Sequence, residues 1–371
     1  MKYPELKVAA TIITVYLLLF LSASGNSQGN KDEDIDLREY RPRFISLSSA
    51  DIKITSSLPI NEIEVFDVRF DTSNIGLLQN SISGKEKLIH IKGGTARAVT
   101  NNFRSAIPLP DPGNEPLTIA LSCFIKKLFI SDNIYIDDGH SVSSSGPSFE
   151  IKSGAMLILE FYAKQNGKYL PLYRFDSTVA GQKDIFHHGE SYLSEILIAS
   201  LRKLKSLNWE KLSSSAKFRD INEINTYNNV RFQLPILKET VKKGIYLRFE
   251  DFKKNKPLDT AFTVEKTKRG DFLYIRNNKG EDKLQTELWG YCDGKDAYIY
   301  SAENYFKLYR YDNTFMIYGA KDFTSVRKLR LNFGLLDMAI PNSNYAKAKT
   351  VNSYKLEFNL FQLDMDSGEL Y

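Results

Sequence analysis

The sequence is poor in the residues that build compact metal and disulfide sites. Its 371 residues include two cysteines and four histidines. No Cys/His pair stands at zinc-binding spacing, and the motif His-Glu-x-x-His is missing. Cys123 and Cys292 permit a single bridge, but unpaired cysteine is among the most buried residue types, so we expect free buried thiols. The sequence therefore predicts no metal site.

Motifs of the common catalytic classes are also missing. There is no Gly-x-Ser-x-Gly elbow, no glycine-rich phosphate loop and no dinucleotide fingerprint. The sequence thus assigns no catalytic residue and no cofactor. Acidic pairs that cleave glycosides can lie far apart in a sequence, so a hydrolase with non-local carboxylates stays an alternative, and enzyme status stays open.

Positive charge is not concentrated anywhere in the sequence. The formal net charge is +5, and lysine and arginine are spread along the chain. Sustained nucleic-acid binding usually needs a basic stripe, so we expect no nucleic-acid partner. No Asn-x-Ser/Thr glycosylation site occurs, which favours a bacterial source for an exported protein.

The chain does begin with a leader-like segment. Lys2 and Lys7 precede the uncharged residues 8–21, which are followed by small polar residues at 22–25. This order is typical of a secretory signal peptide, and the apolar run is shorter than the roughly 17–25 residues of a spanning helix. We expect residues 1–25 to be cleaved, with an uncleaved anchor as the alternative. The protein would then be exported, to the periplasm or the outer surface, and would meet the membrane only transiently through this segment.

The remaining chain predicts two domains. Residues 26–50 are polar and turn-rich and indicate a flexible linker. Residues 51–207 predict an α+β domain, and residues 208–260 a connecting segment. In the α+β domain we expect a hairpin at Asn166-Gly167, together with strands at 62–70, 86–92, 117–130, 155–163 and 169–175 and helices at 95–104 and 191–207.

Residues 261–371 predict a mainly-β antiparallel meander. Turns this short allow only antiparallel pairing, so the domain is either barrel-like or half of a sandwich. Asp293-Gly294 favours a type I′ hairpin turn. We expect strands at 261–267, 271–277, 285–292, 295–301, 304–311 and 314–319, with a late strand at 354–363.

Three charged clusters favour structural roles. Asp67, Arg69 and Asp71 alternate in an expected strand, where the two aspartates would stand about 13 Å apart, too far for one ion. We expect these three residues to form a row of charges on a solvent-exposed face of the strand. Residues 137–140, Asp-Asp-Gly-His, predict a loop without enough oxygen ligands for calcium. His187-His188 predicts exposed side chains at a helix start.

Aromatic residues concentrate in the meander. Tyr305, Tyr309 and Tyr311 share one face of an expected strand with Lys307. One interpretation is a tyrosine-rich binding face. The other is structural, because tyrosine is favoured in strands as well as in interfaces. We take Tyr305, Tyr309 and Tyr311 as the candidate binding residues.

Two runs resemble exported proteins of unknown function from Bacteroidetes-type bacteria. One joins residues 288–294, Leu-Trp-Gly-Tyr-Cys-Asp-Gly, to residues 297–300, Ala-Tyr-Ile-Tyr. The other joins residues 235–237, 244–246 and 249–252. The resemblance covers about the C-terminal half and implies no activity, because that group has no established chemistry.

Together these observations predict an exported, non-enzymatic envelope protein. Its β domain would contact another envelope protein or a surface polymer. A secreted hydrolase and a glycan-binding module that uses stacked tyrosines are the alternatives.

Overall fold

A computed structural model gives the structure of the chain. It describes residues 42–78, 87–110, 119–137, 148–215, 217–258, 261–267, 270–276, 279–301, 304–319 and 359–371. The leader, most of the loop expected at 137–147 and the start of the strand expected at 354–363 lie outside these residues. The described part is mostly β, and its sheets are largely antiparallel, which confirms the expected fold class at that level.

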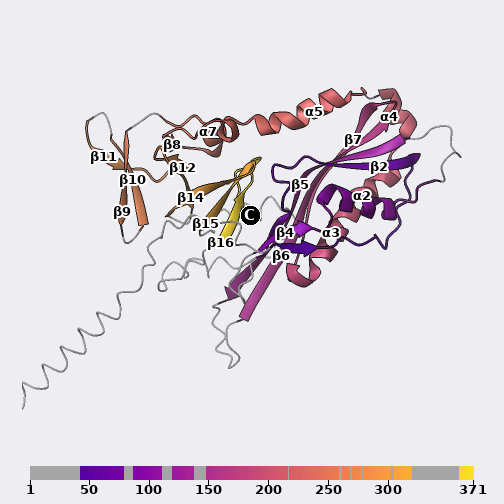
Figure 1. The fold of residues 1–371 in the computed structure, drawn as a ribbon, viewed down its shortest axis with the longest axis horizontal. Helices are drawn as coiled ribbons and strands as arrows, with labels where there is room; N and C mark the ends of the chain where they lie inside the picture. The colour runs from indigo at the N-terminus through magenta and orange to yellow at the C-terminus, as the bar shows by residue number, and fades with distance from the viewer. Residues whose placement is uncertain are drawn as a thin grey trace, which may run out of the picture.

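A seven-stranded sheet forms one end of the molecule (Figure 1). Its path runs β1-β4-β3-β5-β6-β7, with β2 paired in parallel to β5. The first strand lies inside the segment 26–50, for which the sequence predicts no order, and it pairs in parallel with β4. The strands are β1 (Arg43–Ile45), β2 (Ile60–Asp67), β3 (Gly76–Leu78), β4 (Lys87–Ile91), β5 (Ile119–Asp137), β6 (Ser148–Gln165) and β7 (Lys168–Gly181).

Helices α2 (Thr95–Ala106) and α3 (Ile185–Leu201) cover one face of this sheet. The helix α2 follows Gly94, whose φ of 90° suits glycine because it has no Cβ. The helix α3 begins after Asp184, whose side chain accepts the backbone N–H of His187. Their apolar sides and the inner face of the sheet form the largest hydrophobic core.

Two local features connect the long strands. Asn166 and Gly167 have φ values of 52° and 75°, and they join β6 to β7 as the sequence predicts. A β-bulge interrupts β5 between Ile125 and Lys127, so the strand has one extra residue relative to β6. As a result Ile125 and Leu128, three residues apart, both face the helices.

Short helices lead from this sheet to the second half of the chain. The helix α5 (Ile221–Asn229) starts with a capping box formed by Asp220 and Glu223. It lies along the face of the sheet opposite α2 and α3, where Ile224 packs on aromatic side chains of β5–β7. The other elements are the 3-10 helices η2 (Arg202–Ser206) and η3 (Val230–Gln233), with α4 (Trp209–Ser215), α6 (Pro235–Lys238) and α7 (Phe249–Lys253).

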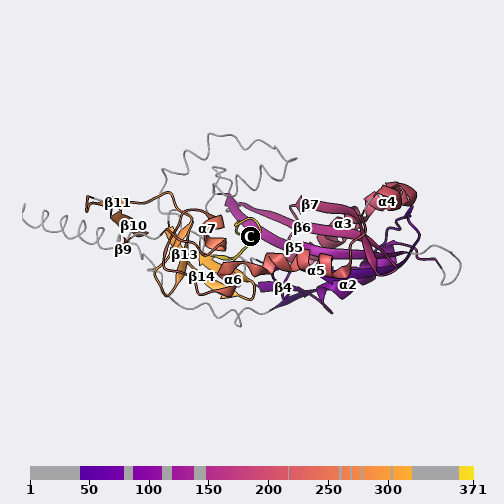
Figure 2. The same cartoon turned by 90° about the horizontal axis from the view of Figure 1, so that it is seen from above.

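Two further sheets form the other end of the molecule (Figures 1 and 2). A six-stranded antiparallel sheet has the order β16-β15-β14-β13-β12-β8, and a three-stranded sheet has the order β11-β10-β9. In the described residues each of these sheets has two unjoined edge strands. The described strands therefore do not close into a barrel, and the barrel-like alternative is wrong. The strands are β8 (Gly244–Tyr246), β9 (Phe262–Thr267), β10 (Gly270–Arg276), β11 (Asp282–Leu284), β12 (Gly290–Cys292), β13 (Ala297–Ser301), β14 (Asn304–Tyr311), β15 (Thr314–Gly319) and β16 (Asn359–Leu363).

Two local predictions in this half are wrong. Residues 285–292 are not one strand, because β11 ends at Leu284 and β12 begins at Gly290. The turn at Asp293-Gly294 is not type I′, because Gly294 has a positive φ of 104° but Asp293 does not. The Asp293 carboxylate accepts the backbone N–H groups of Lys295 and Asp296 and closes a longer loop.

The two ends of the molecule meet through a small apolar cluster. Leu77 and Leu88, from β3 and β4, pack on Met316 and Leu360, from β15 and β16. Among the described residues, no helix is both long and apolar enough to cross a membrane. Both cysteines are buried free thiols, as expected.

Candidate functional site

The strand β14 separates two environments by its alternating side chains. Phe306 and Leu308 point into an apolar core shared with α6 and α7. Tyr305, Lys307, Tyr309 and Tyr311 occupy the opposite face. The structure therefore places the three predicted tyrosines on one face of β14. Other elements cover the two ends of this face, so the tyrosines differ in exposure.

Tyr305 is buried at one end of this face. Its ring lies 5.1 Å from that of Tyr291 and 5.0 Å from that of Tyr300. The three-stranded sheet covers this end, with Leu273 of β10 in the same cluster. Only 4% of Tyr305 is exposed, and burial raises the pKa of its hydroxyl. Tyr305 is therefore a core residue.

Tyr311 lies at the opposite end, against the seven-stranded sheet. Its hydroxyl is 3.1 Å from the hydroxyl of Ser73. Its ring packs beside the cluster of Leu77, Leu88, Met316 and Leu360. Tyr311 is thus half-buried in the contact between the two ends of the molecule.

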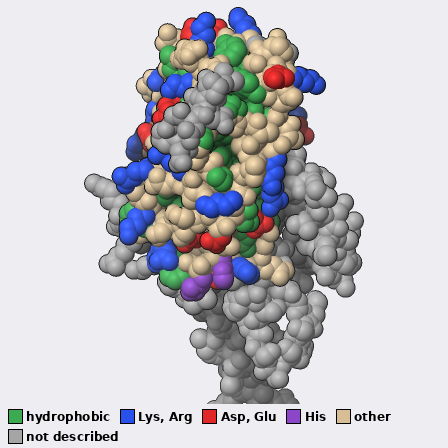
Figure 3. All heavy atoms as spheres, turned by 90° about the vertical axis from the view of Figure 1, so that its right-hand side faces the viewer, with side chains coloured by type: hydrophobic (Ala, Val, Ile, Leu, Met, Phe, Trp, Pro, Cys, Tyr) green, Lys and Arg blue, Asp and Glu red, His purple; other side chains and the backbone are tan. Residues whose placement is uncertain are grey.

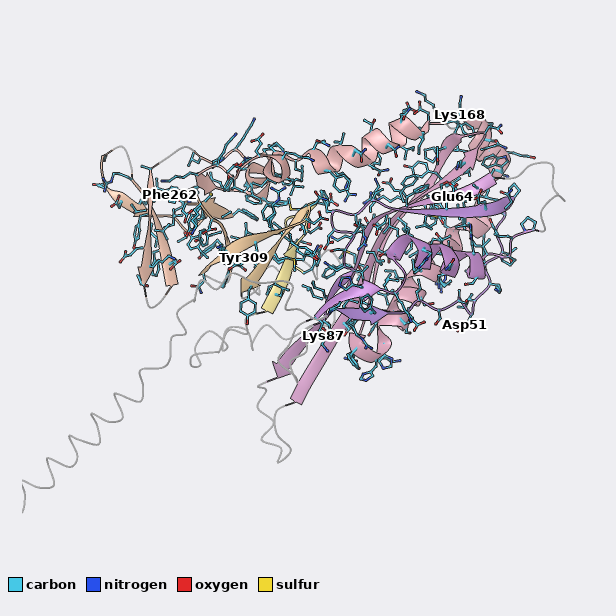
Figure 4. The ribbon with its side chains drawn as sticks, viewed as in Figure 1. Asp51, Glu64, Lys87, Lys168, Phe262 and Tyr309 are labelled. Carbon is cyan, nitrogen blue, oxygen red and sulfur yellow. The ribbon has the colours of Figure 1, made fainter. Side chains whose placement is uncertain are left out.

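Between these covered ends lies a more open strip. Tyr309 lies near the middle of this face (Figure 4) and is half-buried. Tyr309 pairs with Met316, so Tyr318, two residues further along β15, faces the same side. Tyr318 is 45% exposed. We name Lys307, Tyr309 and Tyr318 the tyrosine strip.

Lys307 gives this strip a fixed charge arrangement. Its ammonium group lies 3.2 Å from the carboxylate of Asp296 and 5.2 Å from the centroid of the Tyr309 ring. A cation near an aromatic face is attracted to it and restrains the ring. The strip therefore presents the half-exposed ring of Tyr318 at the surface. Tyr318 was absent from the predicted site because its place depends on the pairing of β14 with β15, which strand parity alone does not give.

The expected row of exposed charges at Asp67, Arg69 and Asp71 is wrong. The strand β2 ends at Asp67, and the two later residues lie in a folded loop. Arg69 and Asp71 are each 5% exposed. The Arg69 guanidinium donates to the Asp67 carboxylate at 2.7 Å and to the Thr95 hydroxyl at 3.2 Å. The loop is held by buried, satisfied polar groups, which stabilise it.

A second buried network lies beneath α5. Lys126 of β5 is 3.4 Å from the carboxylate of Glu160 on β6, and its ammonium lies 4.2 Å from the Tyr227 ring centroid. Glu160 also accepts the hydroxyls of Tyr162 at 3.2 Å and Tyr227 at 3.0 Å. Burial lowers the pKa of Lys126, although Glu160 opposes that shift. The Glu160 carboxylate is surrounded by donors from the chain itself. We therefore assign this network a stabilising role in the fold.

A cavity of about 60 Å³ lies where the two ends of the molecule meet. Asp71 and Asp364 are among its lining residues. Lys127 donates to Asp364 at 2.5 Å, and Gln362 donates to Asp71 at 3.3 Å. Burial alone would raise the pKa of Asp364, but the charge and hydrogen bond of Lys127, with Ser367, hold it below its ordinary value. A general acid needs the opposite shift, so Asp364 is poorly suited to that role.

Other chemistry-bearing residues have ordinary surroundings. His187 lies in the first turn of α3, and its ring is 2.8 Å from the carboxylate of Asp184. No group of three or more His, Cys, Asp or Glu in the described residues could hold a metal ion. Figure 3 shows the right-hand end of Figure 1, where lysine and arginine side chains are interspersed with acidic ones.

Comparisons with known proteins give little to add. No family model and no curated protein matches the chain. Two crystal structures are similar in part. One is an uncharacterized protein with 10% identity and a TM-score of 0.28, covering 44% of this chain and 97% of its own. The other, a Xanthomonas campestris protein of family DUF330, has 8% identity and a TM-score of 0.23, covering 44% of this chain and 91% of its own. Scores this low support no argument about fold or function.

Proposed function

We propose that this chain is an exported, non-enzymatic envelope protein that uses the tyrosine strip to contact another envelope protein or a surface polymer. The observation that carries the proposal is the half-open middle of the β14 face, where Tyr309 and Tyr318 lie between two covered ends. Tyrosine is enriched in interfaces because its ring is apolar and its hydroxyl hydrogen-bonds. In the cavity between the two ends of the molecule, Asp71 and Asp364 already accept hydrogen bonds from other side chains of this chain. This weakens the hydrolase alternative.

The domain organisation belongs to the same proposal. We infer an α+β domain at 51–207, a connecting segment at 208–260 and a β-meander domain at 261–371. The strands β1 and β8 lie outside these bounds but pair within the seven-stranded and six-stranded sheets, so each domain would extend to include its strand. Separate hydrophobic cores support this division, since one core joins the seven-stranded sheet to α2 and α3 and others lie around β14. Phe70 packs in the core of the second half, so the two units would be tightly joined.

The leader and the resemblance complete the proposal. We infer that residues 1–25 direct export, to the periplasm or the outer surface, and are removed. We also infer kinship with the exported Bacteroidetes-type proteins of unknown function. Mass spectrometry of the chain recovered from periplasmic and membrane fractions tests the first point. An intact Met1 in a membrane fraction would contradict cleavage.

A pull-down with matched variants tests the binding surface. The chain, as the cell processes it, is used to capture partners from envelope extract and to co-sediment with purified cell-wall polymer. We expect a double variant, Tyr309→Ser and Tyr318→Ser, to lose the captured protein or polymer. Leu284→Ser removes a comparably exposed apolar side chain, 42% exposed, from β11 and should retain it. Equal capture by all three proteins would contradict the proposal, and a hydrolytic activity abolished by Asp71→Asn or Asp364→Asn would favour the hydrolase.

A further inference from the structure

The outer edge of β7 is an open strand edge in the described part of the chain. The strand is the last of the seven-stranded sheet, and β6 pairs with its other edge (Figure 2). On the outer edge, the structure describes one bridge, between Tyr169 and Arg219. Alternate residues of the segment 172–178 therefore direct backbone N–H and C=O groups outward. Such an edge can pair with another strand.

A row of alternating charges ends at this edge. On the sheet face beneath α5, Lys126 of β5 lies 3.4 Å from Glu160 of β6. The other oxygen of Glu160 lies 3.2 Å from Arg174 of β7. The row thus runs positive, negative, positive across three strands. Its last member, Arg174, has a side chain that is 49% exposed.

Asp176 makes the edge complementary to itself. It lies two residues after Arg174 on the same face of β7, and its side chain is 60% exposed. When two such strands pair antiparallel about a two-fold axis at Phe175, Arg174 of each copy faces Asp176 of the other. The row of alternating charges then continues into the second copy, with two opposite-charge pairs directly across the new contact.

We propose that β7 pairs antiparallel with β7 of a second copy of this chain, centred on Phe175. Other registers are disfavoured, because a shift of the axis by one residue places Arg174 opposite itself or Asp176 opposite itself. Parallel pairing also puts like charges opposite each other. Pro171, which has no N–H, and the Tyr169–Arg219 bridge bound the contact at one end. The resulting dimer would have one sheet running through both copies.

Charge exchange tests the partner. Sedimentation of the purified full chain, as the cell processes it, should show a concentration-dependent dimer. Asp176→Arg and Arg174→Asp each place like charges across the axis, so each variant alone should associate about tenfold or more weakly. An equal mixture of the two restores both opposite-charge pairs and should restore the dimer. A wild-type monomer at the highest soluble concentration, or a mixture no tighter than either variant, would overturn the proposal.

A matched control separates this effect from a general change of charge or loss of folding. Glu265 is an exposed acid on β9, the edge strand of the three-stranded sheet. Glu265→Arg changes the net charge as Asp176→Arg does and should leave the dimer unchanged. Arg174→Asp also removes a partner of Glu160, so circular dichroism must show that it folds. If it does not, Asp176→Arg with its control decides the question alone.

Disulfide trapping tests the register. In the proposed dimer, residue 175 faces its own counterpart, and Phe175→Cys should form a bridge between copies on mild oxidation. Ser177→Cys is the matched control, because the two 177 positions stand about 13 Å apart at 3.3 Å per residue and should not bridge. The native Cys123 and Cys292 are buried and stay out of the reaction. A dimer that bridges at 177 but not at 175 would overturn the pairing.

Discussion

The two large sheets each bury one apolar face but treat the opposite face differently. The seven-stranded sheet places charges there, and Lys126 and Glu160 are held by neighbours from β7 and α5. The six-stranded sheet places tyrosines there, covered at the two ends and more open between them. A buried charge is costly unless it is paired, whereas a tyrosine tolerates partial exposure. The charged face of the seven-stranded sheet is therefore covered by its own neighbours. The tyrosine face of the six-stranded sheet keeps a partly exposed region.

The largest effect is expected from the apolar face of the seven-stranded sheet. Phe103 of α2 is fully buried, with its ring 6.3 Å from that of Phe161. Phe103→Ala should lower the free energy of unfolding by about 3–5 kcal/mol, because it leaves a cavity. Urea denaturation measures this loss. The matched truncation Leu284→Ala, at an exposed site, should change stability by less than about 0.5 kcal/mol, and an equal loss in both variants would contradict the assignment of the core.

Breaking the charged face should cost somewhat less. Glu160→Gln leaves Lys126, whose side chain is 4% exposed, without its negative partner. We expect a loss of about 2–3 kcal/mol in the free energy of unfolding, because a buried ammonium group is left without its carboxylate acceptor. Adding Lys126→Met should recover much of this loss, because no unpaired charge then stays buried. The single variant Lys126→Met completes a double-mutant cycle. If the loss of stability in the double variant equals the sum of the two single losses, Lys126 and Glu160 are not coupled.

The contact between the two ends of the molecule should depend on acid pH. Neighbours of Asp364 hold its pKa below the ordinary value of 3.8, so its contribution to stability is present above that value and is lost as the pH falls through the folded-state pKa. Asp364→Asn should cost about 1.5 kcal/mol at neutral pH. The difference from wild type should shrink below pH 3.8, as measured by denaturation across the acid range. Asp366→Asn alters a more exposed carboxylate, 45% exposed, and should have a smaller effect.

A smaller effect is expected at the covered end of the tyrosine face. Tyr311→Phe removes the hydrogen bond between the hydroxyls of Tyr311 and Ser73. The free energy of unfolding should fall by about 1 kcal/mol. Ser73→Ala in the same protein should then cost less than it does alone, as a double-mutant cycle measures. Fully additive losses would show that the two hydroxyls do not interact.

Chemical modification should distinguish the tyrosines without changing stability. Tetranitromethane should nitrate Tyr318 readily and Tyr305 slowly, because their exposed fractions are 45% and 4%. Mass spectrometry of peptides from briefly treated, folded protein reports the order of reaction. The unfolded protein is the control and should show no preference. Early nitration of Tyr305 would contradict its placement in the core.

The sequence predicts strands best where turns are local. The strands β14 and β15 match their expected ranges because a two-residue turn at Asp312-Asn313 separates them. The sequence also predicts correctly that Tyr305, Tyr309 and Tyr311 share a face, since that depends on parity alone. Their different burial could not be predicted, because it depends on β10 at one end and on β3 and β4 at the other. These neighbours are distant in sequence.

The buried loop after β2 could not be predicted for the same reason. The alternation of Asp67, Arg69 and Asp71 is typical of an exposed strand. The structure instead surrounds Arg69 with Thr95 and the carbonyl of Leu128, from elements that follow much later in the chain. A single sequence carries no sign of such long-range hydrogen bonds.

The bulge in β5 has a consequence for the whole molecule. One surplus residue lets two consecutive lysines serve separate partners, Lys126 with Glu160 beneath α5 and Lys127 with Asp364 near the C-terminus. Deleting either lysine would give β5 a regular pleat in which Leu128 and the residues after it keep their sides, but one lysine would then remain for two carboxylates. The same deletion would also remove one of these two ion pairs. A change of one residue in length would thus break either the ion pair beneath α5 or the one near the C-terminus.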